Sequence, residues 1–190
     1  GIHRYTSAHL ELWTDIDPEL AVPLPALMDQ ALVALAEYFG PPLPARDGAP
    51  FQLTGYIMRD RDRFRAAGML PEDVEDFAHG RHRDYEFWMN DQEYDYYRRH
   101  LMIHEGTHCF MMIMPATVRP PLWYLEGMAE LFGTHRVDAE GRAEFGVMPD
   151  DPHHFVGFGR IGQALADRAR PFGMKLLVAD PYVAPAVVEA

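Results

Sequence analysis

Two histidines and a glutamate in the run His104-Glu105-Gly106-Thr107-His108 are the residues of this chain best suited to chemistry. Residues four apart lie on one face of a helix, so both imidazoles can point at one metal ion. Glu105 lies about 100° round the helix from His104 and can flank that ion without binding it. A general base that takes a proton from metal-bound water must stand at such a place. The spacing therefore predicts a zinc site formed by His104 and His108, with Glu105 as the catalytic base.

Two histidines make a poor site, so a third ligand is expected from another element. Glu126 follows His108 after seventeen residues, and a connector over 115–121 can fold its helix back against the first. We therefore predict Glu126 as the third zinc ligand. Glu130 lies one turn later on the same face and is expected to accept a hydrogen bond from the outer ring N–H of His104. One zinc ion per chain is the predicted cofactor.

Such a site predicts a metal-dependent hydrolase. The ion lowers the pKa of bound water from ~15.7 towards ~7 and polarises a carbonyl. Peptide-bond cleavage is the favoured reaction, with Glu105 passing the proton to the leaving amine. Two alternatives stay open, namely a zinc hydrolase of a non-peptide small-molecule amide and a non-catalytic binding module stabilised by its metal.

The spacing of apolar residues predicts an α+β fold in a single domain over residues 1–190. A small mixed β-sheet is expected to pack on the active-site helix, with a second helix carrying the glutamate ligand. Residues 71–83, including His79 and His82, are interpreted as an exposed loop. The expected elements are strands over 9–14, 51–58 and 85–89, helices over 24–39, 59–67, 91–114, 122–132 and 158–168, and a hairpin over 135–148.

Composition limits the partners. The net charge of −12 argues against nucleic acid as the main partner, and 48% hydrophobic residues are ordinary for a globular protein. A single cysteine, Cys109, excludes an internal disulfide framework. No apolar run suggests a membrane span. The first residue is Gly1 rather than Met, which leaves open both a cytoplasmic protein and an exported one with its leader removed. The oligomeric state also stays open.

Beyond this pattern, the chain resembles the gluzincin group of zinc metallopeptidases. The stretch Pro121-Leu122-Trp123-Tyr124-Leu125-Glu126-Gly127-Met128-Ala129-Glu130 is similar to the one that carries the glutamate ligand in peptidase MA-like families. Residues 5–15 and 56–64 resemble a bacterial domain-of-unknown-function family in that group. The resemblance implies zinc bound by His104, His108 and Glu126, with Glu105 as base and a peptide or protein as substrate.

The resemblance carries three further implications. The strand before the metal-binding helix, Tyr85–Met89, would be an edge strand that pairs with an extended substrate. Related domains continue with another helical segment, which implies a truncation at the C-terminus. The family also uses a side chain beyond the glutamate helix to stabilise the transition state, and the candidates here are His135, Tyr124, His153 and His154.

Overall fold

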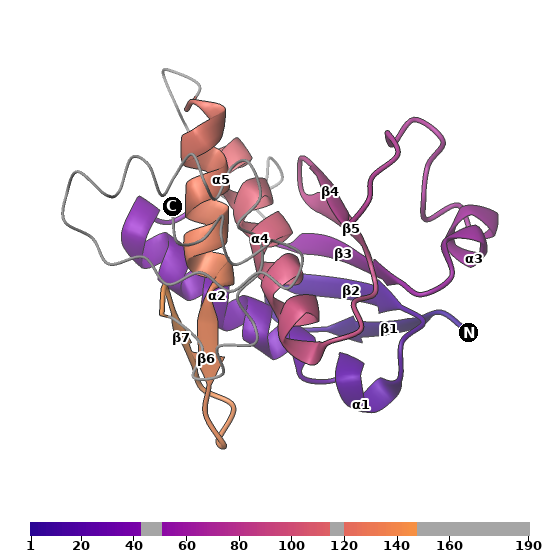
Figure 1. The fold of residues 1–190 in the computed structure, drawn as a ribbon, viewed down its shortest axis with the longest axis horizontal. Coiled ribbons are helices and arrows are strands. Elements are labelled where there is room, and N and C mark those ends of the chain that lie inside the picture. The colour runs from indigo at the N-terminus through magenta and orange to yellow at the C-terminus, as the bar shows by residue number, and fades with distance from the viewer. Residues whose placement is uncertain (43–50, 115–119, 148–190) are drawn as a thin grey trace, which may run out of the picture. The chain divides into compact units, whose positions relative to one another are not determined.

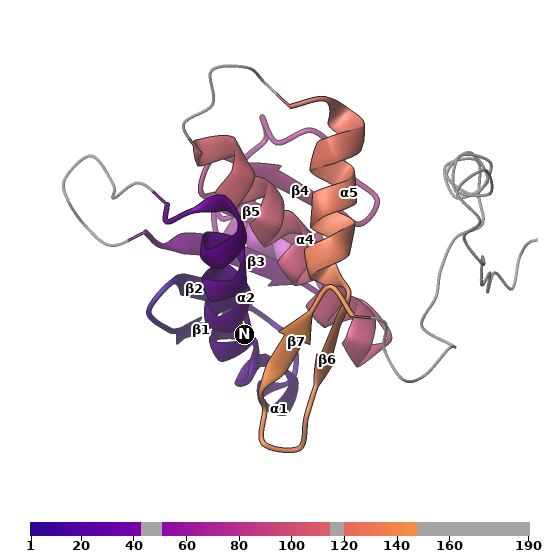
Figure 2. The same ribbon diagram turned by 90° about the vertical axis from the view of Figure 1, so that its left-hand side faces the viewer.

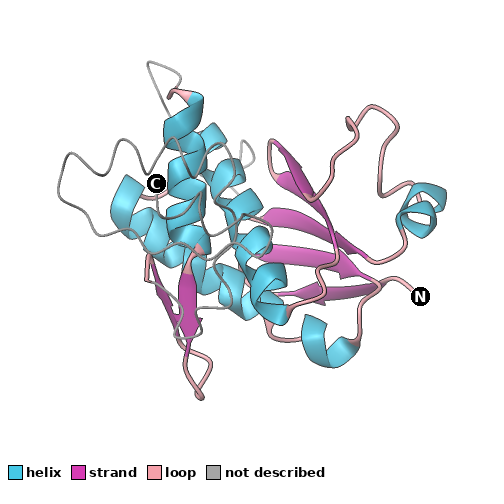
Figure 3. Cartoon of the chain, in the orientation of Figure 1, coloured by secondary structure: helices cyan, strands magenta, loops and turns pink. Residues whose placement is uncertain are grey.

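A five-stranded mixed sheet with helices packed against it gives the chain an α+β fold (Figures 1 and 3). The computed structural model describes residues 1–42, 51–114 and 120–147, which all belong to the compact unit Gly1–Met148. The elements in chain order are β1 (His3–Thr6), β2 (Leu10–Thr14), α1 (Pro18–Ala21), α2 (Leu24–Phe39), β3 (Leu53–Met58), α3 (Arg61–Ala66), β4 (Gly80–Arg83), β5 (Glu86–Asn90), α4 (Asp95–Ile113), α5 (Leu122–Gly133), β6 (His135–Val137) and β7 (Ala143–Phe145).

The strands of the sheet lie in the order β1-β2-β3-β5-β4. The three central strands are parallel, and the two outer strands pair antiparallel with their neighbours. In β2 every second residue is buried, as expected for a strand that turns one face to a packed core. The central strand β3 alternates in the same way but also buries Met58, which belongs to the core on the other face of the sheet.

Helices α2 and α4 pack on one face of the sheet, and α4 lies between the sheet and α5 (Figures 1 and 2). Gly106 permits the close approach of α2 to α4, since a Cβ at this position would lie 2.6 Å from the Met28 methyl group. The other face of the sheet packs against α3 and the segment that follows it. Its smaller core consists of Met58, Phe64, Leu70 and Trp88.

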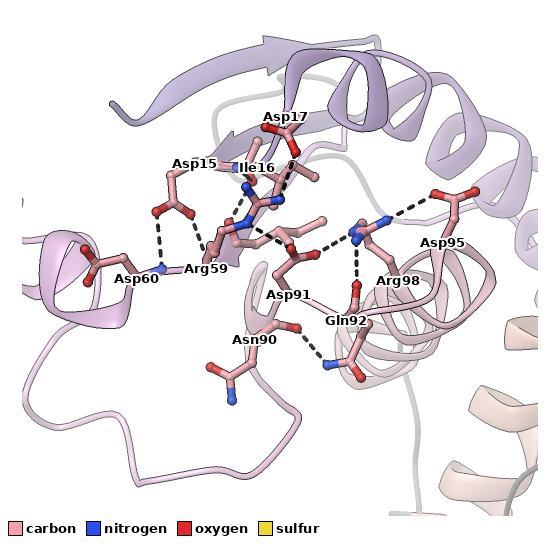
Figure 4. Close-up of polar contacts among 12 residues, drawn as sticks. Asp15, Ile16, Asp17, Arg59, Asp60, Asn90, Asp91, Gln92, Asp95 and Arg98 are labelled. Atoms are coloured by element: carbon pink, nitrogen blue, oxygen red, sulfur yellow. Dashed lines mark hydrogen bonds and ion pairs between the residues drawn. The ribbon is translucent and has the colours of Figure 1, made fainter.

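A network of charged side chains fixes the beginning of α4 to the carboxyl ends of the parallel strands (Figure 4). Arg98 is buried and donates to Asp91, which follows β5, at 2.6 Å, and to the Gln92 carbonyl. Arg59, which follows β3, lies 3.4 Å from the second oxygen of Asp91 and also contacts Asp17. Asp91 forms ion pairs with both Arg98 and Arg59, so the start of α4 is linked to the ends of β5 and β3.

Two sequence-based expectations about the sheet are wrong. The segment predicted as an exposed loop over 71–83 contains β4, so His82 lies on a strand. The strand predicted over Tyr85–Met89 is β5, which lies between β3 and β4 and is not an edge strand. It therefore cannot pair with an extended substrate, and the implication drawn from the gluzincin resemblance fails. The described strand at that edge is β4.

One helical stretch of the described residues, Pro18–Phe39, is long and apolar enough to cross a membrane. Its most apolar window is 44% buried in the fold, and a core helix passes the same test of length and composition. The apolar side of α2 packs in the main core through Leu24, Met28, Ala31 and Leu35. The stretch is thus weak evidence for a membrane span. The expectation of a single domain over 1–190 stays a prediction, because residues 148–190 lie outside the described part.

Candidate metal centre

The side chains of His104, His108 and Glu126 converge where α4 faces α5. The Nε2 atoms of the two histidines lie 3.1 Å apart, and each lies 3.5 Å from the same Glu126 oxygen. A ligand atom from each of the three residues falls within 4.8 Å of the others. His108 is buried, whereas half of the Glu126 side chain is exposed. The cluster is therefore buried on the side of the histidines and exposed to solvent on the side of Glu126.

Helix geometry accounts for this convergence. His104 and His108 are one turn apart on α4, and the two helices pack along their length, so α5 brings Glu126 opposite both imidazoles. The next turn of α5 brings Glu130 to the other side of His104, where its Oε1 lies 3.1 Å from Nδ1. The second Glu130 oxygen lies 3.3 Å from Nε2 of His100, one turn earlier on α4. Glu130 thus bridges two histidines, and its contact with His104 is at the outer nitrogen.

Glu105 lies beside this cluster rather than in it. Its side chain is only 7% exposed, and one carboxylate oxygen lies 3.0 Å from Nδ1 of His82 on β4. The ring of His82 also stacks on that of His108, with centroids 4.4 Å apart. Sequence reasoning missed His82, because the polar run Gly80-Arg81-His82-Arg83 lacks the alternation that indicates a half-buried strand.

The imidazoles of the cluster have opposite pKa shifts in the metal-free protein. Burial lowers the pKa of His104, but its bonds to the Glu126 and Glu130 carboxylates outweigh burial and raise it to about 9. Burial, and then the neighbouring imidazoles of His104 and His82, lower the pKa of His108 to about 4. The carboxyl pKa of Glu126 is lowered, first by its bond to His104. At neutral pH His104 is thus a charged imidazolium between two carboxylates, and His108 is a neutral imidazole.

The structure describes two of the four residues proposed as transition-state stabilisers, and these two make other contacts. His135 is buried, donates from Nδ1 to the Gly133 carbonyl oxygen at 2.7 Å, and stacks on Tyr96. Tyr96 lies twelve residues before His108, which is ~18 Å of helix at 1.5 Å per residue. Tyr124 packs against the main core and its ring contacts Trp123. His153 and His154 lie outside the described residues.

We expect Glu130→Gln to weaken metal binding by about 10- to 100-fold, the usual effect of losing a carboxylate that orients a histidine ligand. The amide keeps the size of the side chain but removes the charge that bonds to His104 Nδ1 and His100 Nε2. Competition with a chelator measures the affinity. Glu140→Gln, an exposed glutamate in the β6–β7 turn, is the matched control and should leave the affinity unchanged. Equal affinities in the two variants would show that Glu130 does not orient a ligand.

Metal affinity should rise with pH up to about 9. Below that pH a metal ion must displace the proton of His104, whose pKa is raised to about 9. Each pH unit should then strengthen binding about tenfold, with a plateau once the imidazole is neutral. His108 adds no further slope above pH 6, because its pKa is lowered to about 4. Chelator competition between pH 6 and 10 measures the slope, and a flat profile below pH 9 would contradict the assignment of His104.

Comparison with known families gives one match, and it lies outside the described residues. Residues 150–190 match the model of the D-isomer specific 2-hydroxyacid dehydrogenase, NAD binding domain. The match covers fewer than half of the 190 residues, so it does not assign the whole chain to that family. No curated protein matches the chain. No solved structure matches it either.

This match overturns the functional expectations drawn above. The matched family is an NAD-binding dehydrogenase domain, so the match contradicts the expectation of a gluzincin-type, peptidase MA-like zinc metallopeptidase and that of zinc as its cofactor. The expected peptide substrate is likewise unsupported, since the matched family is named for dehydrogenases of 2-hydroxy acids. The two alternatives, a non-peptide zinc hydrolase and a metal-stabilised binding module, gain no support from the comparison. The residues of the cluster itself are not part of the match, so it does not test their role as ligands.

The signal that sequence reasoning missed is a glycine pattern in the matched segment. Gly157, Gly159 and Gly162 have the spacing G-x-G-x-x-G, and Asp180 follows eighteen residues after the last of them. Three glycines at this spacing and a later acidic residue are the fingerprint of dinucleotide-binding βαβ units. The fingerprint requires a helix that opens at the glycines, and the helix predicted over 158–168, which lies outside the described residues, would meet this requirement. Weighing the two together predicts a nucleotide site.

Proposed function

We propose that this chain joins two binding functions, one for NAD and one for a divalent transition-metal ion. Residues 150–190 provide the first and His104, His108 and Glu126 the second. The NAD-binding segment sets the reaction class, which is hydride transfer between NAD and a small 2-hydroxy acid. The match of that segment to a dehydrogenase NAD-binding domain is the observation that carries this proposal.

The glycine pattern gives the match a physical basis. In such units the first glycine permits a tight turn, the second lets the backbone approach the pyrophosphate, and the third permits close packing of helix on strand. Gly157, Gly159 and Gly162 have the types and spacing for these three roles. An acidic residue about 20 positions further on accepts hydrogen bonds from the ribose 2′-hydroxyl. Asp180 is the candidate for that role and favours NAD over NADP, whose 2′-phosphate it would repel.

NADH titration of the full chain tests this function. Saturable quenching of protein fluorescence by NADH, with clearly weaker binding of NADPH, is expected. A coupled assay should then detect NADH consumption with small 2-oxo acids, the reverse of hydroxy-acid oxidation. No NADH binding at millimolar concentration would refute the proposal. Binding without turnover would leave NAD recognition intact and refute the dehydrogenase reaction for this chain.

The second function is proposed on the convergence of three ligand atoms within 4.8 Å of one another. Two imidazole nitrogens and one carboxylate oxygen form a donor set that suits divalent transition metals. The two Nε2 atoms are turned towards each other and towards one carboxylate oxygen, which is the arrangement expected of side chains around a common ion. When bound, an ion with three protein ligands would act as a Lewis acid at its open positions.

Elemental mass spectrometry on the chain, purified without added metal and then loaded with cobalt(II), tests the second function. About one ion per chain after dialysis is the expected result. A stoichiometry near zero for cobalt would refute the metal site. Because the two functions rest on separate residues, the failure of one assay would leave the other proposal standing.

A further inference from the structure

Strand β4 lies beside α4, next to the proposed metal ligands (Figure 1). Two of its residues lie close to the same side chain of α4, Glu105. Gly80 and His82 are two residues apart, so both turn to one face of the strand. His82 Nδ1 lies 3.0 Å from Oε2 of Glu105. A Cβ on Gly80 would lie 2.9 Å from Cδ of Glu105, closer than side chains tolerate. Gly80 therefore leaves space for Oε1 of Glu105, and His82 is a hydrogen-bond partner for Oε2.

We infer that Gly80 and His82 hold the Glu105 carboxylate beside the proposed metal ligands and keep it from becoming a ligand itself. His82 is in this view a positioning residue that acts through Glu105. The inference rests on the metal site proposed above for its functional meaning. The contacts between β4 and Glu105 are independent of that proposal and can be tested in the metal-free chain.

Burial makes the partner of Glu105 important. Glu105 is buried, and a buried carboxylate is costly unless it accepts hydrogen bonds. His82 provides such a bond from a neighbouring strand, while Glu105 itself belongs to the same helix as the two histidines. A carboxylate released from His82 would have His104 as its sequence neighbour, and carboxylates are good ligands for the metals that imidazoles bind. Holding Glu105 on β4 thus preserves an open position on the ion.

His82 is also fixed from a second direction. Its ring stacks on His108 with an interplanar angle of 25°, so the orientation of the imidazole that meets Glu105 is set by a proposed metal ligand. A phenylalanine at position 82 can keep this stacking but has no hydrogen to donate. An asparagine can present an amide N–H near the place of Nδ1 but cannot stack in the same way. The two substitutions therefore separate the donor from the ring.

Carboxyl-carbon NMR of the metal-free full chain, with ¹³C at Cδ of its glutamates, tests the contact directly. The Glu105 resonance is identified by its loss in Glu105→Gln. We expect His82→Phe to shift this resonance and His82→Asn to return it towards the wild-type position. The control is His79→Phe, an exposed histidine just before β4, which should have no effect. A Glu105 resonance that is unchanged in His82→Phe would overturn the inference.

The absorption spectrum of the cobalt(II)-loaded chain then tests the consequence for the ion. In His82→Phe and in Gly80→Ala, Glu105 is expected to be released and to coordinate the cobalt, which changes the visible spectrum. Combining either substitution with Glu105→Gln should abolish that change. Spectra of His82→Phe and Gly80→Ala identical to the wild type would overturn the inference. If the wild type bound no cobalt, the metal proposal would fail, while the carboxyl-carbon experiment would still decide whether β4 holds Glu105.

Discussion

His108→Ala will lose its divalent metal ion during dialysis, whereas the wild type will retain about one. His108 Nε2 contributes one of three converging ligand atoms, 3.1 Å from His104 Nε2 and 3.5 Å from a Glu126 oxygen. Loss of a residue that merely orients a ligand costs about 10- to 100-fold in affinity, so loss of a ligand should exceed ~100-fold. Elemental mass spectrometry after dialysis, followed by chelator competition, measures the effect.

The control for His108→Ala must show that loss of metal does not follow from loss of any histidine. His3 is exposed on β1, at the edge of the sheet opposite β4, and His3→Ala should retain the wild-type metal content. Thermal unfolding of the metal-free variants checks that both fold. A full complement of metal in His108→Ala would remove this histidine from the site, and loss of metal in His3→Ala would make the assay unspecific.

Gly159→Val will abolish NADH binding, with an affinity loss of at least ~100-fold. The second glycine of the fingerprint lets the backbone approach the pyrophosphate, and a branched side chain would block that approach. Hydrogen bonds from backbone N–H groups to a charged group contribute about 1.5–3 kcal/mol each. A 100-fold loss corresponds to about 2.8 kcal/mol, so the loss of one or two such bonds accounts for it. Fluorescence titration with NADH measures the effect.

Side-chain size provides the internal control for this prediction. Gly159→Ala adds one methyl group and should weaken NADH binding less than Gly159→Val does. Asp167→Asn changes an acidic residue of the same segment outside the fingerprint and should leave the affinity unchanged. If Gly159→Val bound NADH as the wild type does, the glycine pattern would be coincidental. Unchanged metal content in Gly159→Val would show that the other site is unaffected.

The elements with strong periodicity could be predicted from the sequence, but the edge strand β4 could not. Helix α2 has the predicted bounds because its apolar residues recur at helical spacing and Gly40 follows. Strand β4 is polar and pairs only with β5 among the described strands, so no pattern of buried residues marks it. Since β4 carries His82, the omission of the strand also hid a residue that contacts Glu105.

The cluster itself could be predicted in part, because two of its ligand atoms come from one helix. The spacing of His104 and His108 places them together whatever the rest of the fold, whereas Glu126 depends on how α5 packs on α4. The same dependence governs the position of His135, one of the candidate transition-state stabilisers. It follows α5 closely in sequence, but α5 runs antiparallel to α4 and leads it to Tyr96, far from His108.

The predicted function is wrong because two motifs of the chain favour different chemistry. The spacing of His104 and His108 favours a zinc peptidase, whereas the glycines at 157, 159 and 162 favour a dinucleotide-binding segment. A motif in one segment of a chain does not describe the whole chain. The family match covers residues 150–190, so it says nothing about the segment that contains His104 and His108.

X-ray absorption spectroscopy of the cobalt(II)-loaded full chain tests the proposed metal centre most directly, because it identifies the ligands of the ion. Two imidazoles and a remaining shell of oxygen atoms are the predicted result. Sulfur in the ligand shell, or fewer than two imidazoles in the wild type, would contradict the assignment of His104, His108 and Glu126.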